Sequence, residues 1–510
     1  MPSLFISAAH KSSGKTTVAI GLCAAFAQRG LRVQPFKKGP DYIDPMWLSQ
    51  AAGRACYNLD FYTMASDEIA AAYARHAQAA DLTLIEGNKG LYDGLDLDGS
   101  NSNAALAKLL HNPVVLVIDA QGMTRGIAPL ILGYQAFDRD VRIVGVILNQ
   151  LGGRRHERKL RAVIEHYTDV PVLGAILRDP EMEIVERHLG LMPSNETPQA
   201  AVRIAAIAQR VAEQVDLDAL LKVSAASSSI KDKNTIAPPV FKGSTSCVPS
   251  PLQGEGQDGG SSLNSLPQSF DHPPPPGKDR VSTISPTSAP PSVIKLGIAR
   301  DAAFGFYYPD DLAALQHAGA QLIPINTLHD QTLPDIDGLF IGGGFPETHM
   351  AALAANTTLR GEIRAAIENG LPTYAECGGL MYLARRITWK ENSHVMVGIL
   401  PGDIVMHARP QGRGYVRLRE RAQHPWPLHS GQEISAHEFH YSSLDNLAPG
   451  VVFAYDVMRG SGVDGAHDGL IYKNLLASYT HLRDVNAHHW AQRFVEFVRS
   501  NKQKDRSTPP

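Results

Sequence analysis

A single cysteine in the C-terminal half of the chain has the neighbours of a nucleophile. The stretch Tyr374-Ala375-Glu376-Cys377-Gly378-Gly379-Leu380 places Cys377 between an apolar, strand-like run and a helix-like run. A tight turn of this kind exposes the thiolate, the small neighbours leave clearance, and the helix N-terminus is expected to lower the pKa of the thiol. A buried structural cysteine is the alternative interpretation. The pattern favours nucleophilic catalysis by Cys377.

A thiolate nucleophile also needs an oxyanion site and a general base. Upstream, Ile341-Gly342-Gly343-Gly344-Phe345-Pro346-Glu347 ends another strand-like run with glycines, whose free N–H groups could form an oxyanion hole. For the base we favour His481, which follows the strand-like run Leu475–Thr480. We interpret His437 and His440 as structural or interface residues, since that is the common role of a lone histidine.

A second chemical signature lies near the start of the chain, in Ala8-Ala9-His10-Lys11-Ser12-Ser13-Gly14-Lys15-Thr16-Thr17. A loop of small residues followed by a helix lets backbone N–H groups surround phosphate oxygens, while Lys15 reaches the outer phosphates and Thr16 can ligate Mg²⁺. Ala8 or Ala9 replaces the usual first glycine, as in the dethiobiotin synthetase and MinD-like branch of P-loop proteins. A chance Gly-Lys-Thr is the alternative, but the strand–loop–helix context favours nucleotide binding.

A Mg²⁺–nucleotide site needs further hard oxygen ligands, and acidic residues end strand-like runs in the same half. Asp41 lies within Lys37–Pro45, and Glu86 closes the run Leu82–Ile85. An acid placed directly after a buried strand lies at the carboxyl edge of the sheet, where open α/β sheets bind their ligands. Asp119 holds a similar position, for which a capping or turn role is equally consistent.

Alternating strands and helices must position these residues. Short apolar runs alternate with longer helical stretches in both halves, which predicts the α/β class, with parallel sheets covered by helices on both faces. The expected strands are Leu4–Ser7, Leu82–Ile85, Val114–Ile118, Val141–Leu148, Val293–Ile298, Gly338–Ile341 and Leu371–Tyr374. The expected helices are Thr17–Gln28 (ended by Gly30), Asp311–Ala318 and Leu359–Glu368.

The length of 510 residues predicts two folded domains. Residues 223–292 are rich in Ser, Pro and Gly and lack apolar periodicity, so we expect a disordered linker, with a partner-binding tail as the less favoured alternative. The expected divisions are therefore 1–222 for the phosphate-loop domain, 223–292 for the linker, 293–500 for the cysteine domain and 501–510 for a disordered tail.

Bulk properties exclude several classes of partner. The formal charge of −3 argues against a long nucleic acid, and no apolar run approaches the length needed to cross a membrane. The first residues do not have the pattern of a signal peptide. The four cysteines lack CxxC spacing, which argues against a zinc site or a disulfide framework. We expect a cytoplasmic protein without nucleic-acid or membrane partners, and a homodimer is compatible with the sequence.

Several longer stretches of the chain resemble the cobyrinic acid a,c-diamide synthase family. They are Phe36–Pro45, Glu86–Gly94, Glu186–Leu191, Ala299–Pro309 and Ala375–Leu383, and apart from the linker the resemblance covers essentially the whole chain. It implies two doubly wound α/β domains. The N-terminal domain would be a deviant P-loop domain similar to dethiobiotin synthetase, and the C-terminal domain a flavodoxin-like class I glutamine amidotransferase.

The resemblance also implies a reaction and a set of site residues. The reaction would be ATP- and glutamine-dependent amidation of the a and c acetate side chains of cobyrinic or hydrogenobyrinic acid, through an acyl phosphate, in cobalamin biosynthesis. Cys377 would attack glutamine, Gly343 and Gly344 would flank the oxyanion, and His481 would relay the proton. The resemblance assigns ATP to Ser12, Ser13, Gly14, Lys15, Thr16, Thr17 and Asn149 (facing the adenine), Mg²⁺ to Thr16, Asp41 and Glu86, and the tetrapyrrole acceptor to Tyr42 and Asp93.

The chain departs from this pattern after the base. Class I glutaminases usually have a glutamate two residues after the catalytic histidine, but here the sequence is His481-Leu482-Arg483, which leaves a Cys–His dyad. Sirohydrochlorin, its nickel form and sirohaem are alternative acceptors for the same chemistry. An alternative of another class is a MinD/ParA-like ATPase switch with a C-terminal binding module, which would not need an activated thiol at Cys377.

Overall fold

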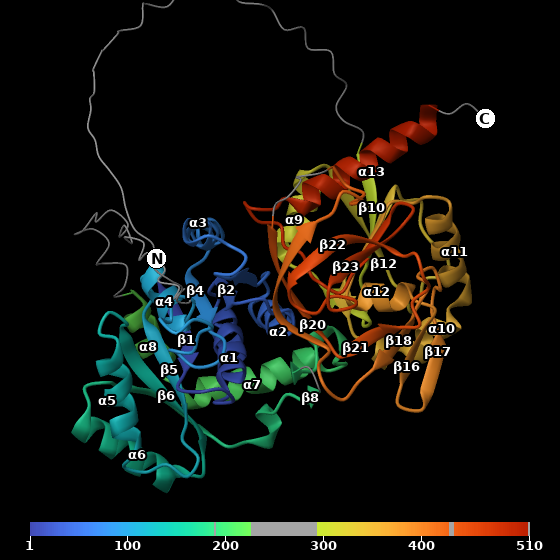
Figure 1. The fold of residues 1–510 in the computed structure, drawn as a ribbon. Coiled ribbons are helices and arrows are strands. Elements are labelled where there is room, and N and C mark those ends of the chain that lie inside the picture. Colours follow the sequence, from blue (N-terminus) through green and yellow to red (C-terminus); the bar gives the residue numbers. More distant parts are fainter. Residues whose placement is uncertain (188–189, 226–292, 428–432, 508–510) are drawn as a thin grey trace, which may run out of the picture. The chain divides into compact units, whose positions relative to one another are not determined.

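The computed structural model describes residues 1–187, 190–225, 293–427 and 433–507. The described residues before and after 232–292 belong to one compact unit, and each half of that unit is an α/β domain (Figure 1). The predicted linker lies outside the described residues from position 226 onward, as do two residues of the Glu186–Leu191 motif.

The N-terminal sheet has seven strands in the order β3-β2-β4-β1-β5-β6-β7, and all of its neighbouring pairs are parallel. The four strands expected in this half are present, with bounds shifted by a few residues. Because helices cover both faces, the strands are buried almost throughout. The strands are β1 Ser3–Ala8, β2 Val33–Lys38, β3 Tyr57–Leu59, β4 Leu82–Glu86, β5 Val114–Asp119, β6 Ile143–Leu151 and β7 Val172–Leu177.

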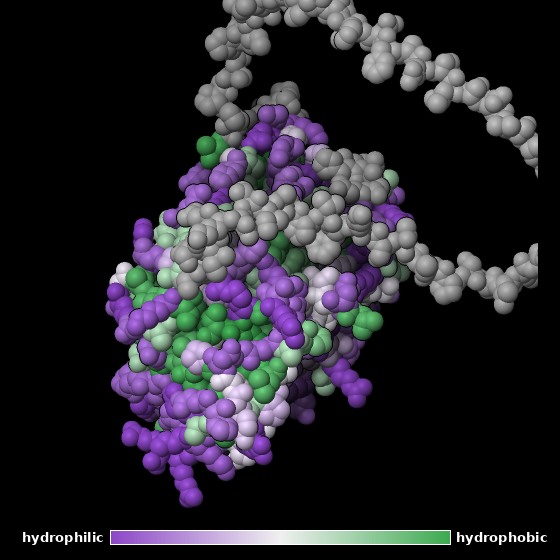
Figure 2. Space-filling model, turned by 90° about the vertical axis from the view of Figure 1, so that its left-hand side faces the viewer, coloured by the Kyte–Doolittle hydropathy of each residue, from purple (hydrophilic) through white to green (hydrophobic). Residues whose placement is uncertain are grey.

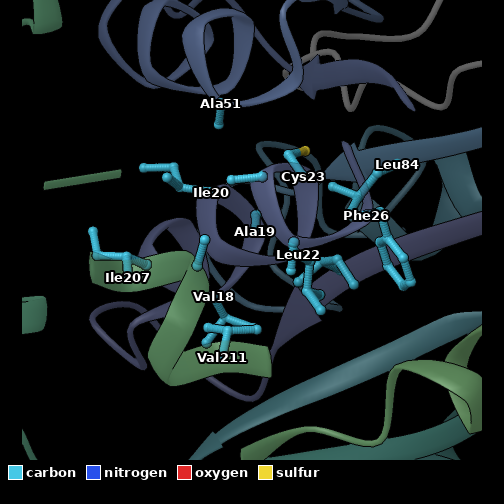
Figure 3. Close-up of a cluster of buried hydrophobic side chains, with 14 of the residues drawn as sticks. Val18, Ala19, Ile20, Leu22, Cys23, Phe26, Ala51, Leu84, Ile207 and Val211 are labelled. Carbon is cyan, nitrogen blue, oxygen red and sulfur yellow. The ribbon is translucent and has the colours of Figure 1, made fainter. Parts of the chain in front are cut away.

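Helix α1, Lys15–Gln28, is apolar on nearly every side and lies inside the N-terminal core. Figure 3 shows its residues between Ile207 and Val211 of α7 and residues of neighbouring elements, such as Ala51 and Leu84. A Cβ on Gly21 would collide with Val211, so the two helices pack at close range. The other helices are α2 Ile43–Ala52, α3 Ser66–Ala77, α4 Asn103–Leu109, α5 Ile127–Phe137, α6 Arg154–Tyr167, α7 Ala200–Gln214 and α8 Leu217–Ala225.

The C-terminal sheet has nine strands in the order β12-β10-β13-β15-β24-β23-β22-β19-β20. Its first five strands are parallel, as expected, but the last four run antiparallel, which corrects the expectation of a purely parallel sheet. Burial alternates along β19, the pattern of a strand with only one covered face. The strands are β10 Ile294–Ala299, β12 Ala320–Ile325, β13 Gly338–Ile341, β15 Thr373–Glu376, β19 Gly412–Glu420, β20 Glu433–His440, β22 Val452–Arg459, β23 His467–Tyr472 and β24 Leu475–Ser478.

Two smaller sheets and five helices complete the described part of the C-terminal half. The last helix, α13, continues through Ser507, so residues 501–507 are helical rather than part of a disordered tail as expected, and residues 508–510 lie outside the described residues. The helices are α9 Pro309–His317, α10 Met350–Ala355, α11 Thr357–Glu368, α12 Gly378–Leu383 and α13 Trp490–Ser507. The small sheets consist of β11 Phe304–Phe306 with β14 Gly343–Gly344, and of β16 Arg386–Trp389, β17 Asn392–Val395, β18 Asp403–Met406 and β21 Ser442–Asp445.

A buried ion pair fixes α13 to the antiparallel strands. The Arg493 guanidinium donates to both Glu420 carboxylate oxygens, at 2.5 and 3.0 Å, and lies 2.8 Å from His488 Nε2. Burial alone would raise the pKa of Glu420, but hydrogen bonds from His488 and Arg493 outweigh it and lower that pKa to about 2. The carboxylate is therefore charged at neutral pH.

Hydrophobic residues also reach the surface on the face drawn in Figure 2. Helix α5 exposes 43% of Leu132 and 76% of Phe137. Among the described residues, no helix has both the length and the apolar character that a membrane crossing requires.

Candidate active sites

The phosphate loop, residues Ala8–Thr17, joins β1 to α1 at the carboxyl edge of the N-terminal sheet. Ser12 and Gly14 have positive φ angles of 66° and 78°, which turn the backbone just before the helix. The Asn149 side-chain amide donates to the Ser13 carbonyl at 2.9 Å, and a Cβ on Gly14 would collide with that amide. Asn149, expected near the adenine, thus braces the loop, and Gly14 is required by both its φ and its lack of space.

The two reactive side chains of this loop converge on one carboxylate. Lys15 Nζ lies 2.9 Å from Glu86 Oε1, and the Thr16 hydroxyl donates to the same oxygen at 2.6 Å. Glu86 ends β4, which pairs directly with β1, and its side chain is fully buried. The structure thus brings together Lys15, Thr16 and Glu86, all three predicted from the sequence.

A lysine and an aspartate that the sequence analysis did not single out complete this cluster. Lys37, at the end of β2, is ion-paired with Asp44, with Glu86 at 3.0 Å and with Asp41 at 3.6 Å. Burial alone would lower the pKa of Lys37, but these three carboxylates outweigh it and raise that pKa well above its ordinary value. We call Lys15, Thr16, Lys37, Asp44 and Glu86 the phosphate-loop cluster.

The cluster offers the kind of oxygen ligands that Mg²⁺ prefers. Asp44 Oδ2 lies 3.3 Å from the Thr16 hydroxyl, so one hydroxyl and two carboxylates lie together. Within the described ranges, no group of three His, Cys, Asp or Glu residues has the arrangement of a metal site formed by protein alone. A site completed by nucleotide phosphates and water fits both observations, because Mg²⁺ commonly keeps few protein ligands.

Three other acids at this edge of the sheet hold the backbone. Asp41 Oδ1 accepts from the amides of Ile43 and Asp44 at 2.9 and 3.2 Å, at the start of α2. Asp93 accepts from the Gly90 amide at 2.8 Å, and Asp119 accepts from the Gln121 amide at 2.9 Å. Of the acids in the Lys37–Pro45 motif, the structure therefore places Asp44, rather than Asp41, beside Thr16.

The nucleophile turn lies at the end of β15. Cys377 has φ 48° and ψ −100°, a backbone conformation that residues other than glycine rarely adopt. Its amide donates to the Ser478 carbonyl at 2.7 Å. A Cβ on Gly379 would collide with the Ile341 carbonyl, so the turn permits only glycine there. These features confirm the tight strand–turn–helix geometry expected around Cys377.

The pKa of the Cys377 thiol is not lowered, contrary to the expectation from the sequence. The helix N-terminus was expected to lower the pKa of Cys377, but burial raises it, the Glu347 carboxylate raises it further, and the Gly378 amide opposes both only in part. Only 6% of Cys377 is exposed, which explains why desolvation dominates. The thiol therefore needs a base to remove its proton.

Two consecutive glycines lie against this turn. β14, which contains Gly343 and Gly344, pairs with β11. A Cβ on Gly343 would lie 2.5 Å from His481 Cε1, whereas a Cβ on Gly344 would collide with the Ala303 carbonyl. A Cβ on Gly378 would lie 2.9 Å from the Gly344 amide nitrogen, so the backbones of the two glycine runs pack closely beside the nucleophile.

His481 reaches the same place from the neighbouring strand. β15 pairs with β24 in parallel, with Glu376 opposite Ser478, so a residue just after β24 lies beside Cys377. His481 is 3% exposed, and its Nδ1 lies 3.3 Å from Glu376 Oε2. Its ring stacks on His437, with centroids 5.0 Å apart. Burial, together with the charges of His481 and Arg483, lowers the pKa of His437 well below its ordinary value, so His437 stays neutral.

Cys377 and His481 line one cavity of about 190 Å³, which we call the thiol pocket. Glu347, His437 and Tyr42 also line it. Tyr42 belongs to the Lys37–Pro45 motif, and its ring stacks on Phe306 and lies 5.1 Å from the His481 ring. Tyr42, assigned by resemblance to the acceptor, therefore lies against His481.

Comparison with known proteins agrees with both parts of this geometry. Residues 5–191 match the CobQ/CobB/MinD/ParA nucleotide binding domain, and residues 295–487 match the CobB/CobQ-like glutamine amidotransferase domain. The chain is 44% identical to a cobyrinate a,c-diamide synthase of Magnetococcus marinus, across 98% of this chain and 97% of that protein. The chain belongs to the cobyrinate a,c-diamide synthase family. The resemblance noted in the sequence is thereby confirmed.

Other members of the cobyrinate a,c-diamide synthase family are similar over the same length. Identity is 38% to the protein of Methanosarcina acetivorans, over 97% of this chain and 95% of that protein, and 36% to that of Archaeoglobus fulgidus, over 98% of both. Among solved structures, PurLQS from Thermotoga maritima is 16% identical with a TM-score of 0.33, covering 42% of this chain and all of that one. This chain is a glutamine-dependent amidating ligase with a nucleotide-binding domain.

Four residues of these sites were not predicted to be site residues: Lys37, Asp44, Glu376 and His437. His437 was expected to be a structural or interface residue. Lys37 and Asp44 lie in the same motif as Asp41, but two acids and two lysines within nine residues gave no basis for choosing among them. Glu376 directly precedes the nucleophile, which was a usable signal. The stacking of His437 on His481 depends on β20 reaching the pocket, for which the sequence carries no local sign.

Proposed function

We propose that this protein uses ATP and glutamine to amidate the a and c acetate side chains of cobyrinic or hydrogenobyrinic acid in cobalamin biosynthesis. The observation that carries the proposal is that one chain contains two sites. Cys377 and His481 line one pocket, and in the other half Lys15 of the phosphate loop pairs with Glu86. The names of the full-length relatives supply the acceptor.

In the glutaminase half, the Cys377 sulfur attacks the carboxamide carbon of glutamine. His481 accepts the thiol proton and passes it to the leaving nitrogen, so that ammonia departs and a thioester remains. Backbone N–H groups of Gly343 and Gly344 stabilise the oxyanion formed during attack. Water then hydrolyses the thioester, giving glutamate and the free thiol.

In the synthetase half, an acceptor carboxylate oxygen attacks the γ-phosphorus of ATP and displaces ADP. The acyl phosphate then reacts with ammonia, and phosphate leaves as the amide forms. This activation is needed because a carboxylate has no leaving group that ammonia can displace. Lys15 and Lys37 supply positive charge to the transferred phosphoryl group. Thr16, Asp44 and Glu86 would hold Mg²⁺, which neutralises phosphate charge when bound.

We place the reaction in the cytoplasm. ATP, glutamine and a free thiolate at Cys377 are all required together, and a reducing compartment preserves such a thiol. The acceptor is a small tetrapyrrole carrying several carboxylates.

The test is amidation of a panel of tetrapyrroles with ATP and either glutamine or ammonium chloride. Each amidation replaces OH by NH₂ and lowers the acceptor mass by about one unit. The wild type is expected to convert cobyrinic acid with both nitrogen sources, and Cys377→Ala only with ammonium. Cys56→Ala, at a buried cysteine in the other half, is the matched control and should behave as wild type.

Two results would contradict the proposal. Glutamine-dependent product from Cys377→Ala would remove the nucleophile assignment. Turnover of sirohydrochlorin or sirohaem, with cobyrinic acid left unchanged, would replace the acceptor while leaving the chemistry in place.

A further inference from the structure

A carboxylate with no role so far lies behind the glutaminase base. Glu376 is 3% exposed, and its two oxygens have different partners. Oε1 accepts from the Leu482 amide at 2.9 Å and from the Tyr374 hydroxyl at 2.6 Å. Oε2 lies 3.3 Å from His481 Nδ1. The carboxylate is thus fixed by one oxygen and presents the other to the histidine ring.

The fold places Glu376 there through strand register. Side chains alternate along β15, so Glu376 and Cys377 leave the strand end in different directions. Glu376 is directed toward the segment that follows β24, where Leu482 and His481 lie. One strand end therefore supplies both the nucleophile and the acid behind its base.

The residue at the usual position of a third catalytic group cannot take this part. Arg483, two residues after His481, carries a positive charge, and its guanidinium donates to the Asn58 carbonyl and lies over the Tyr308 ring. Of the charged groups around the His481 ring, the one within hydrogen-bond reach of Nδ1 in the described structure is Glu376.

We propose that Glu376 is the positioning residue that completes a Cys377–His481–Glu376 triad. Its Oε2 accepts from Nδ1–H of His481, which leaves Nε2, on the side of Gly343, free to take the thiol proton. After that transfer the carboxylate stabilises the imidazolium. The 3.3 Å separation is long for such a bond and shortens when the ring becomes charged.

The protonation of Tyr374 supports separate roles for the two Glu376 oxygens. Burial and the negative charge of Glu376 raise the pKa of Tyr374 well above its ordinary value, so its hydroxyl keeps the proton that it donates to Oε1. Glu376 is thereby held in one orientation.

The decisive variant is Glu376→Gln in the full-length protein, because the isostere separates the two roles. Leu482 and Tyr374 both donate to the Oε1 position, so the amide oxygen stays there and the NH₂ group faces Nδ1. That group donates to Nδ1, fixes the proton on Nε2 and prevents the ring from accepting the thiol proton.

We expect glutamate release from glutamine to fall by about 100-fold or more near neutral pH, as loss of the tautomer-setting acid does in a serine triad. The deficit should narrow as pH rises, because hydroxide then removes the thiol proton without the base. Ammonium-dependent amidation should stay within about twofold of wild type, since its site lacks the altered group.

Tyr374→Phe is the matched control, because it removes a partner of Oε1 and leaves Oε2 facing His481. It should retain glutaminase activity within about fivefold of wild type, the usual scale for one neutral hydrogen bond. The assignment is overturned if Glu376→Gln releases glutamate at the wild-type rate, if its deficit is constant across pH, or if Tyr374→Phe falls as far.

This role rests on the glutaminase chemistry proposed above, and the wild type separates the two. Failure of the wild type to release glutamate from glutamine would overturn that chemistry and the triad with it. An active wild type with an equally active Glu376→Gln variant overturns only the triad.

Discussion

The phosphate-loop cluster and the thiol pocket differ in what holds their reactive groups. In the cluster, Lys15 and Lys37 are held by ion pairs with Glu86 and Asp44. In the pocket, Cys377 is held by backbone strain and by glycine contacts that leave no space for a Cβ. One region is organised by charge and the other by packing.

The difference indicates how each region meets its ligand. Ion pairs between mobile side chains can be exchanged for phosphate and metal charges of similar strength, so the cluster must rearrange when ATP binds. Packed backbone cannot be exchanged in this way, since each contact is a steric limit. We therefore expect the thiol pocket to be preformed and the cluster to be completed by its ligands.

The largest effect is expected from Lys15→Ala. Removing Lys15 leaves Lys37 as the remaining cation beside Glu86, and takes away one of the two positive charges proposed to act on the transferred phosphoryl group. Amidation should fall by about 10²–10³-fold with either nitrogen source, whereas basal glutamate release should persist.

Lys108→Ala is the control, because Lys108 forms a surface ion pair with Asp138. Such pairs contribute little, so both activities should be unchanged. Loss of glutamate release in Lys15→Ala would show that the two regions are not separately organised.

A smaller effect, on glutamate release rather than on ammonium-dependent amidation, is expected from Gly343→Ala. The added Cβ would lie 2.5 Å from His481 Cε1, so the base must shift. Misplacement of about 1 Å can reduce turnover by about 100-fold, and glutamate release should fall by about 10- to 100-fold while ammonium-dependent amidation is retained. Gly361→Ala, with open space around its Cβ in α11, should be neutral. A Gly343→Ala protein with full glutaminase activity would show that the pocket adapts.

Tyr42→Ala addresses the segment that touches both regions. Tyr42 lies against His481, and two residues later Asp44 pairs with Lys37. If this segment couples the regions, the ratio of glutamine-dependent to ammonium-dependent amidation should fall by about tenfold. If Tyr42 instead binds the acceptor, as the resemblance implies, the KM for the acceptor should rise with both nitrogen sources and the ratio should stay constant. Tyr167→Ala, at an exposed ring ending α6, is the control.

The sequence predicts those residues of both regions whose positions depend on local pattern. The five residues that could be found all lie at or shortly after the end of a strand, or at the start of a helix, where local pattern carries the signal. They are Lys15, Thr16, Glu86, Cys377 and His481. The α/β class and the parallel strands follow from the same periodicity.

What the sequence did not predict depends on contacts between distant segments. The choice of Asp44 over Asp41 depends on how α2 begins, and the pairing of Glu376 with His481 depends on the register of β15 with β24. The antiparallel edge of the C-terminal sheet was missed because its alternating strands lie among loops without helical spacing. The raised pKa of Cys377 arises from burial, which only the assembled domain produces.

The smallest effect on turnover is expected from Glu420→Gln, which tests whether the preformed pocket depends on a rigid frame. Glu420 is nearly buried beside Arg493, and its folded pKa of about 2 lies below its ordinary value of 4.5. The unfolded state therefore binds the proton more tightly. The stability from this group is present above about pH 4.5 and is lost as pH falls toward 2.

At neutral pH the Glu420→Gln substitution leaves Arg493 without its charge partner. We expect the free energy of unfolding to fall by about 3 kcal/mol and Tm to fall on the order of 5–10 °C. Glutamate release and ammonium-dependent amidation at 25 °C should stay close to wild type. The comparison is Asp81→Asn: hydrogen bonds from Arg32 lower the pKa of Asp81 to about 2 as well, but that ion pair is exposed. Its Tm should change little, because solvent screens the pair. Equal shifts in Tm for the two variants would mean that burial does not distinguish the two ion pairs. Loss of glutamate release from Glu420→Gln at 25 °C would show that the thiol pocket depends on the Glu420–Arg493 pair.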